Sequence, residues 1–400
     1  MSGSGTPIQR SPGRLSFLLV TFAFLMAMLG TTLPTPLYPI YQTRMDYSQI
    51  IITVIFAAYA VGVIAALIGF GSWSDQLGRR RLLIAGLGLA IVSNVVFLSS
   101  PQLVPLLIGR LLSGLSAGIF TGTATVAVIE QAPPEWQKGA TLTATATNVM
   151  GLGLGPLVAG VLAQYAVWPL HLPYALHIVL CLLAIIGVWW APETVERPDR
   201  VHLHIQRLGV PDEVRGVFIP AGIAGFAGTA VLGLFTAAAP SFVQKLLEID
   251  NLAMIGVVVI TLFIASALGQ AGMRFIPERR RLIIGCLILA TGVLVVGSAI
   301  GLASLWLMLI GAAISGAGQG LTLRAGLGEV VGASPADRKS EVTSTYFVVI
   351  YVAISLPVVG LGVTAALTSL VAAGIVFSVI VAALALTAMG LLIRRQRREG

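Results

Sequence analysis

The residues of this chain best suited to ionic chemistry lie in a short charged loop between two long apolar segments. Gly71, Asp75 and Gly78 precede a run of three arginines that starts with Arg79 and Arg80. Glycine allows two backbones to approach closely while the chain turns, and a carboxylate here can pair with an arginine or with the positive N-terminus of a helix. The spacing therefore indicates a packed ionic contact, although three arginines could also serve only to keep the loop on one side of a membrane.

Three further ionisable residues are candidates for ion coupling, namely Arg110, Glu130 and His177. Arg110 falls inside an apolar segment, where a charge is costly and functional by default, although an arginine at this depth can also extend to the headgroups. No Asp or Glu falls near the middle of any apolar segment, so the usual proton carrier is missing. His177 remains a candidate, although a histidine on an apolar helix is more often a hydrogen-bonded packing residue.

A segment rich in glycine and proline, here called the Gly/Pro segment, contains Gly151, Gly155, Pro156 and Gly160. Proline inside a helix removes a backbone hydrogen bond and produces a kink, and small residues allow close contact with another helix. We expect this surface to face the opposite half of the molecule and to be an interface that opens and closes. A purely structural kink is the alternative.

Composition places these motifs in a lipid bilayer. Hydrophobic residues make up 57% of the 400 residues and charged residues only 10%, against roughly 25% charged residues in soluble domains. A helix needs about 20 mainly apolar residues to cross a membrane, and the runs lack the alternation of a spanning strand. We predict an all-α membrane protein with twelve transmembrane helices. Their expected ranges are 16–38, 49–68, 82–98, 103–129, 140–164, 173–190, 216–243, 252–273, 282–303, 305–331, 342–364 and 367–393.

The chain has two similar halves. A polar stretch separates six predicted spans from six, so we expect one bundle at 1–190, a cytoplasmic central loop at 191–215 and a second bundle at 216–400. Small residues and prolines recur in the same order in both halves, as Gly114 and Gly316 illustrate. Parallel repeats of this kind form two bundles that rock about a site at mid-membrane.

The basic residues predict the orientation of the chain. Placing both ends and every second loop in the cytoplasm puts most of the 24 lysines and arginines on that side, as the positive-inside rule requires. The formal charge of +8 then reflects loops that face an anionic leaflet, and no nucleic-acid partner is needed to explain it. We expect a multi-pass monomer of the cell inner membrane with both termini in the cytoplasm.

The three motifs, in this order, resemble those of the major facilitator superfamily. The charged loop resembles that family's signature between helices 2 and 3, Arg110 with Gly114 its fourth-helix motif, and the Gly/Pro segment the fifth-helix motif of its proton-coupled exporters. The chain departs from the family pattern at Trp73, Gln76 and Ala159. The resemblance implies a twelve-helix fold of two six-helix repeats.

The resemblance also implies roles for individual residues. The charged loop would latch the two halves together on the cytoplasmic side in the outward-facing state. In that role Arg79 and Arg80 would be partners of Asp75 or lipid-facing anchors. Arg110 would take part in proton coupling or in binding an anionic group.

The substrate cavity should be lined by polar and aromatic side chains near the middle of the spans. Such a lining suits a neutral or weakly charged amphipathic molecule that is held by stacking and a few hydrogen bonds. The expected lining residues are Thr31, Thr35, Tyr59, Asn148, Phe235, Gln319, Tyr346 and Tyr351.

We therefore predict a secondary active transporter and not an enzyme. The chain has no phosphate-binding loop for a nucleotide, so an ion gradient must drive it. The predicted activity is export of a small organic compound or drug in exchange for protons by alternating access, and the alternative is uptake of a metabolite by proton symport or uniport. No metal or cofactor is expected, because the two cysteines form neither a disulfide framework nor a zinc pattern.

Overall fold

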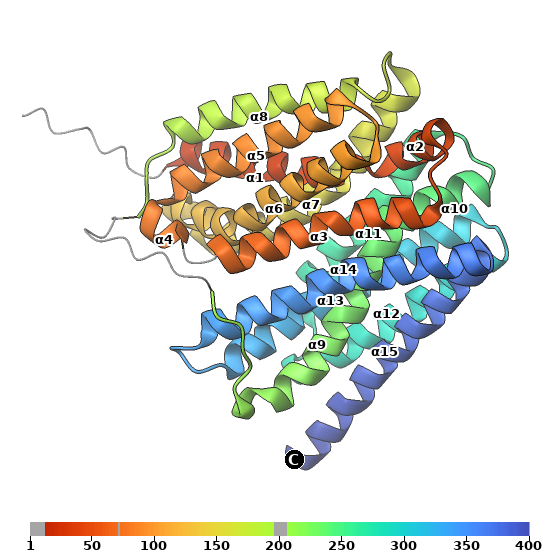
Figure 1. Ribbon diagram of the computed structural model, residues 1–400. Coiled ribbons are helices and arrows are strands. Elements are labelled where there is room, and N and C mark those ends of the chain that lie inside the picture. Colours follow the sequence, from red (N-terminus) through yellow and green to blue (C-terminus); the bar gives the residue numbers. More distant parts are fainter. Residues whose placement is uncertain (1–12, 71–72, 196–205, 400) are drawn as a thin grey trace, which may run out of the picture.

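The computed structural model describes residues 13–70, 73–195 and 206–399, without the side chains of Asp75 and Glu399 (Figure 1). These residues form helices and no strand, and twelve helical segments among them are long and apolar enough to cross a membrane. The all-α architecture with twelve spans is therefore confirmed. Gly71 and residues 196–205 of the central loop lie outside the described residues.

The first six spans form a bundle in the upper part of Figure 1. Helix α1 begins on the same face on which the last helix ends, and this face is here called the termini face; the opposite end is the distal face. The helices of this first bundle are α1 (Arg14–Thr32), α2 (Tyr38–Met45), α3 (Gln49–Phe70), α4 (Trp73–Leu77), α5 (Arg79–Ser99), α6 (Leu103–Gln131), α7 (Gln137–Tyr165) and α8 (Leu172–Trp190).

The last six spans form a second bundle, which runs from green to blue in the lower part of Figure 1. Helices α3 and α7 of the first bundle pack against α14 and α11 of the second. The helices of the second bundle are α9 (Asp212–Gly233), α10 (Ala239–Lys245), α11 (Leu252–Gly272), α12 (Glu278–Gly301), α13 (Leu305–Ala333), α14 (Lys339–Leu367) and α15 (Leu370–Glu399).

The first predicted span is broken near its distal end. Helix α1 stops at Thr32, a short 3₁₀ turn covers Thr35–Leu37, and α2 then starts at Tyr38. Pro34 and Pro36 explain the break, because a proline has no backbone N–H to donate and its ring clashes with the preceding turn. The seventh span changes geometry at the same depth, where a π turn at Leu234–Ala238 joins α9 to α10.

The two halves share unusual backbone features. Helices α2 and α10 each lead to a non-glycine residue with positive φ, Asp46 and Glu248, both at φ 53°. These residues occupy equivalent places after the first span of each half, next to the distal loops. This common geometry supports the proposed duplication.

Glycines allow the same close helix contact in both bundles. A Cβ atom on Gly114 of α6 would lie 2.1 Å from the Tyr59 carbonyl of α3, and one on Gly316 of α13 would lie 2.3 Å from the Leu262 carbonyl of α11. Only glycine fits where backbones approach this closely. Both contacts fix the position of helices that carry the central site.

Candidate functional site

A cavity of about 110 Å³ lies between the two bundles, near the middle of the spans. Its walls come from α1, α3, α6 and α7 of the first bundle and from the second bundle's α9, α11, α13 and α14. Every lining residue is uncharged, and hydroxyl, amide and aromatic groups supply its polar and stacking surfaces. The predicted cavity residues found in this lining are Thr31, Tyr59, Asn148, Gln319 and Tyr351.

The structure places three other predicted cavity residues elsewhere. Thr35, in the turn after α1, and Phe235, in the π turn, are each fully enclosed by protein. Tyr346 precedes Tyr351 by five residues, so the two side chains point about 140° apart around α14. The Tyr346 ring therefore packs inside the second bundle, edge-to-face on Phe218 with ring centres 6.2 Å apart.

Arg110 is fully buried between α6 and α1, with an exposed fraction of 0%. Its Nη1 donates to the Thr31 carbonyl at 2.6 Å, and its Nη2 donates to the Tyr38 hydroxyl. The guanidinium carbon also lies 5.3 Å from the centre of the Tyr38 ring and 5.9 Å from that of Phe56. In the described part of the chain it has no carboxylate partner, and its Nε has no acceptor. The side chain is thus held inside the bundle and does not extend to the headgroups.

His177 is enclosed by α1, α5 and α8. Its Nδ1 lies 2.8 Å from Nδ2 of Asn94, and its Nε2 lies 2.9 Å from the Met26 carbonyl. An amide nitrogen can only donate and a carbonyl can only accept, so this arrangement fits a neutral imidazole with its proton on Nε2. A Cβ on Gly30 would lie 2.2 Å from the ring, so the glycine makes room for it.

Thr31 connects the surroundings of Arg110 and His177 with the central cavity. Its carbonyl accepts from Arg110. Thr31 also lines both the central cavity and a smaller cavity of about 10 Å³, which His177 lines as well. Thr31 thus lies between these two ionisable groups and the central cavity.

The charged loop is anchored within the first bundle. Arg79 donates to the two carboxylate oxygens of Glu130 at 3.2 and 3.4 Å and to the Ser74 hydroxyl at 2.5 Å. The Thr194 hydroxyl donates to the same carboxylate at 2.5 Å. Glu130 lies some 20 residues along α6 from Arg110, about 30 Å at the helical rise, so the structure does not bring these two coupling candidates together. The side chain of Asp75 lies outside the described residues.

Glu193 caps the start of α5, a role that the sequence analysis missed. Its carboxylate accepts from the backbone N–H groups of Arg79 and Arg80 at 2.9 and 3.3 Å, and a negative charge is favourable at a helix N-terminus. Gly78, at φ 95°, makes the turn that precedes the helix. The Arg80 side chain instead reaches α8, where it lies over the Trp189 ring at 5.3 Å.

The Gly/Pro segment of α7 faces two neighbours. Gly151 and Gly155 pack on α1 of the same bundle, where a Cβ on Gly155 would lie 2.3 Å from the Leu29 carbonyl. Gly160 instead packs on α11 of the second bundle, with a Cβ placed 2.5 Å from the Leu252 carbonyl. The expectation that all these residues face the opposite half thus holds for only part of the segment, because positions 151 and 155 share one helix face and 160 lies on another.

Hydrogen bonds join the bundles at the distal face. The Ser241 hydroxyl contacts the side-chain oxygens of Gln42 and Gln49 at 3.1 and 2.8 Å. The backbone N–H of Leu252 donates to the Gln164 side chain at 2.8 Å. The cavity is therefore closed toward the distal face.

A family model for the Major Facilitator Superfamily matches residues 20–356, most of the chain. The chain belongs to the major facilitator superfamily. The family and the fold are those of membrane transporters, so this superfamily member is a multi-pass transport protein. The family that the sequence analysis predicted is therefore confirmed.

Solved structures of this superfamily share the fold. The crystal structure of the human organic anion transporter MFSD10 (TETRAN) has a TM-score of 0.67 at 17% identity and covers 97% of this chain and 100% of that chain. A bacterial homolog to the human lysosomal transporter Spinster, inward-facing and unoccupied, has a TM-score of 0.71 at 14% identity and covers 95% and 97%. At these identities the likeness shows the fold alone.

Bacterial relatives of this superfamily member match over shorter lengths. MdtD of Escherichia coli (strain SE11), provisionally named a multidrug resistance protein, is 24% identical over 254 residues, 64% of this chain and 50% of that protein. MdtD of Pectobacterium atrosepticum is 23% identical over 177 residues, 44% of this chain and 38% of that protein. The chain spans half the length, or less, of these curated relatives.

Several hydroxyl and aromatic residues in the cavity of this facilitator were not predicted from the sequence. A threonine or serine in an apolar helix commonly bonds to its own helix four residues back, and no local signal tells which of them also face a cavity. Thr121 does both, since its hydroxyl contacts the Ala117 carbonyl at 2.8 Å and the Tyr351 hydroxyl of the other bundle at 3.4 Å. The missed residues include Phe56, Thr121, Thr229, Thr236, Phe263, Ser266 and Phe347.

The Glu130 network of this facilitator should matter for stability. We expect Glu130→Gln to destabilise the purified protein by about 1–3 kcal/mol, because Arg79 and Thr194 would lose a charged acceptor. Thermal unfolding in detergent measures this. Glu135→Gln is a matched control, since Glu135 pairs with Arg14 at 3.7 Å with both side chains over 60% exposed, and exposed pairs contribute about 0–1 kcal/mol. Equal midpoints for the two variants would contradict the prediction.

Proposed function

We propose that this facilitator exports a small, neutral or weakly charged amphipathic organic compound in exchange for protons. The observation that carries the proposal is the central cavity, which both bundles line with hydroxyl, amide and aromatic groups and with no charged side chain. Such a site binds by stacking and a few directed hydrogen bonds. The provisional name of the MdtD relatives, which refers to multidrug resistance, supports export.

Alternating access would follow from rocking of the two bundles about this cavity. The contacts of Ser241 with Gln42 and Gln49, together with the packing of Gly160 on Leu252, hold the distal side closed. In the proposed cycle they break when the distal side opens. The charged loop and its arginines would act at the termini face, which we propose to be the cytoplasmic side of the inner membrane because basic residues favour that side. The proposed unit is the monomer.

Proton coupling is proposed for the polar groups around Thr31. His177 is the ionisable ring enclosed near the cavity, and we assign it the proton; protonation would require Asn94 to turn its amide oxygen toward Nδ1. Arg110 contacts the same helix, since it donates to the Thr31 carbonyl of α1 and His177 contacts the Met26 carbonyl. A proton on His177 would thus change the electrostatic surroundings of Arg110 and of the cavity wall at Thr31.

The uncharged lining predicts how a new charge would change selectivity. Gln319→Glu keeps the acceptor that receives the Ser266 hydroxyl at 2.6 Å but can place a carboxylate in the cavity. We expect transport of the neutral antibiotic chloramphenicol to fall by about tenfold relative to that of the lipophilic cation ethidium, because an unpaired buried charge costs several kcal/mol. Counterflow in proteoliposomes with both compounds measures the ratio.

Gln137→Glu makes the same chemical change at the exposed start of α7, outside the cavity. Its transport ratio should stay within about twofold of that of the parent. The cavity proposal fails if Gln319→Glu leaves the ratio unchanged, or if Gln137→Glu shifts it as strongly.

A further inference from the structure

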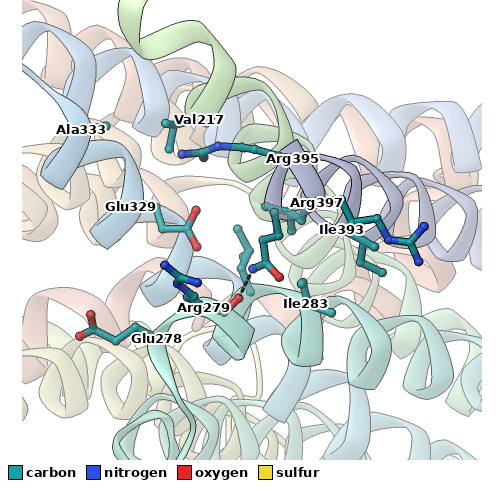
Figure 2. Close-up of a pocket in the computed structure, with 12 residues that line it drawn as sticks. Val217, Glu278, Arg279, Ile283, Glu329, Ala333, Ile393, Arg395 and Arg397 are labelled. Atoms are coloured by element: carbon teal, nitrogen blue, oxygen red, sulfur yellow. Dashed lines mark hydrogen bonds between the residues drawn. The ribbon is translucent and has the colours of Figure 1, made fainter. Parts of the chain in front are cut away.

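A second cavity, of about 610 Å³, lies at the termini face of the second bundle. Its walls come from the ends of α9, α12, α13 and α15, and Figure 2 shows charged side chains from three of these helices around it. The proposed transport cycle does not use this cavity. Its charged lining residues are Glu278, Arg279, Glu329, Arg395 and Arg397.

The arginines of this cavity are only partly balanced by the chain itself. Glu278 pairs with Arg281, at 3.1 Å. Arg279 and Arg397 have exposed side chains, and neither forms an ion pair with the described residues. Gln396 donates to the Arg279 carbonyl and so ties α15 to the start of α12. Two guanidinium groups therefore remain available to an external anion.

At the equivalent end of the first bundle, carboxylates of the chain itself contact the arginines and the helix N-terminus. There the chain leaves α8 at Trp190, and Glu193 follows to accept from the N–H groups at the start of α5, while Glu130 pairs with Arg79. In the second bundle α15 instead continues as a helix to Glu399. At this end the described part of α15 contributes arginines, and the carboxylates of the cavity lining come from Glu278 of α12 and Glu329 of α13. An anion from outside would play the part of Glu193.

The surroundings of the cavity match a lipid better than a soluble anion. Its floor is apolar, with Leu282 and Ile283 from α12 and Leu392 and Ile393 from α15. The same two helices carry exposed apolar side chains such as Leu287 and Ile380, as lipid-facing helices do. Arginines that follow an apolar span lie at the level of the headgroups, and basic pockets between spans bind lipid phosphates.

We propose that this cavity binds the phosphate of an anionic phospholipid. Arg279 and Arg397 contact the phosphate, and an acyl chain follows the apolar surface of α12 and α15. The bound lipid joins the ends of these helices at the termini face. A free phosphate ion could make the same guanidinium–phosphate contact as the lipid headgroup. The apolar floor of the cavity favours the lipid over the free ion.

Lipid binding to the purified full-length chain, measured by native mass spectrometry, tests the proposal. Phosphatidylglycerol should bind more tightly than phosphatidylcholine. The double variant Arg279→Gln/Arg397→Gln should weaken phosphatidylglycerol binding by about tenfold or more. The matched control Arg394→Gln/Arg398→Gln removes the same charge from exposed positions outside the cavity lining, and should change binding by less than about twofold.

Three results would overturn the proposal. An equal loss in both double variants would mean diffuse attraction to the basic surface. Equal binding of the two lipids would mean that the net negative charge of the headgroup is not recognised. Displacement of phosphatidylglycerol by an equal concentration of inorganic phosphate would assign the site to a soluble anion. Arg397→Gln alone, at an exposed side chain without a described contact, should retain the fold and show part of the expected loss.

Discussion

Replacing Arg110 by lysine should reduce transport by at least about tenfold while the protein remains folded. The guanidinium donates to the Thr31 carbonyl and the Tyr38 hydroxyl in two directions at once and lies over two aromatic faces. Lysine keeps the charge but presents it as a point at the end of a flexible stem. Losing one hydrogen bond to a charged group costs about 1.5–3 kcal/mol, which corresponds to the expected change in rate.

Chloramphenicol efflux from proteoliposomes and thermal unfolding separate this effect from loss of fold. Arg324→Lys is the matched control, because Arg324 lies on the equivalent helix α13, is only partly buried and donates to the Gln270 carbonyl at 3.1 Å. It should transport within about twofold of the parent. Full activity of Arg110→Lys would show that the geometry around Thr31 is not needed for transport.

Substitution of Gly160 by valine should open the distal side. A Cβ at this position would lie 2.5 Å from the Leu252 carbonyl and 3.3 Å from the Cα of Ala253. Both neighbours are backbone atoms of the other bundle, so side-chain rotation cannot relieve the clash. The distal-closed arrangement is destabilised, whereas an arrangement with the bundles parted at this point is not. The equilibrium should therefore move toward the distal-open state.

A cysteine at position 35 reports this change. Thr35 is fully buried near the distal face, and its hydroxyl has no hydrogen-bond partner in the described part of the chain, so Thr35→Cys removes no described contact. In Gly160→Val its labelling by a membrane-impermeant maleimide should rise about tenfold or more, as expected for a population shift above 1 kcal/mol. The native Cys181 and Cys286 are buried and give little background.

Gly139→Val serves as the control for the glycine prediction. It lies on the same helix, and an added Cβ would meet no atom within 4 Å, so labelling should match that of the Gly160 parent. If labelling does not rise in folded Gly160→Val, then the contact between α7 and α11 is not part of the distal gate.

The spans could be predicted from the sequence because lipid exposure demands long apolar runs. An apolar run does not show where the helix within it is interrupted. The first span was predicted as one helix through Tyr38, yet Pro34 and Pro36 end α1 at Thr32. Tyr38 is the first residue of α2 after this break, and its hydroxyl accepts from Arg110.

The cavity lining was predicted only in part. A polar or aromatic residue in an apolar span is a candidate for the lining, but the rotation of its helix about the helix axis determines whether the side chain faces the cavity. Tyr346 and Tyr351 have the same chemistry and neighbouring positions, but only Tyr351 faces the cavity. The phase of α14 depends on how it packs against α3 and α9, which are distant in sequence. Glu193 was missed for a similar reason, since its contact with the start of α5 joins residues more than 100 positions apart.

Proton movement caused by substrate tests proton-coupled export most directly. Proteoliposomes with an acidic interior and a trapped pH dye are given chloramphenicol, ethidium or benzoate in turn. We expect substrate-dependent release of protons, and Arg110→Lys should lower this release by at least about tenfold. Substrate counterflow without any proton movement would contradict proton coupling and identify a uniporter, and proton movement in the same direction as substrate would identify a symporter.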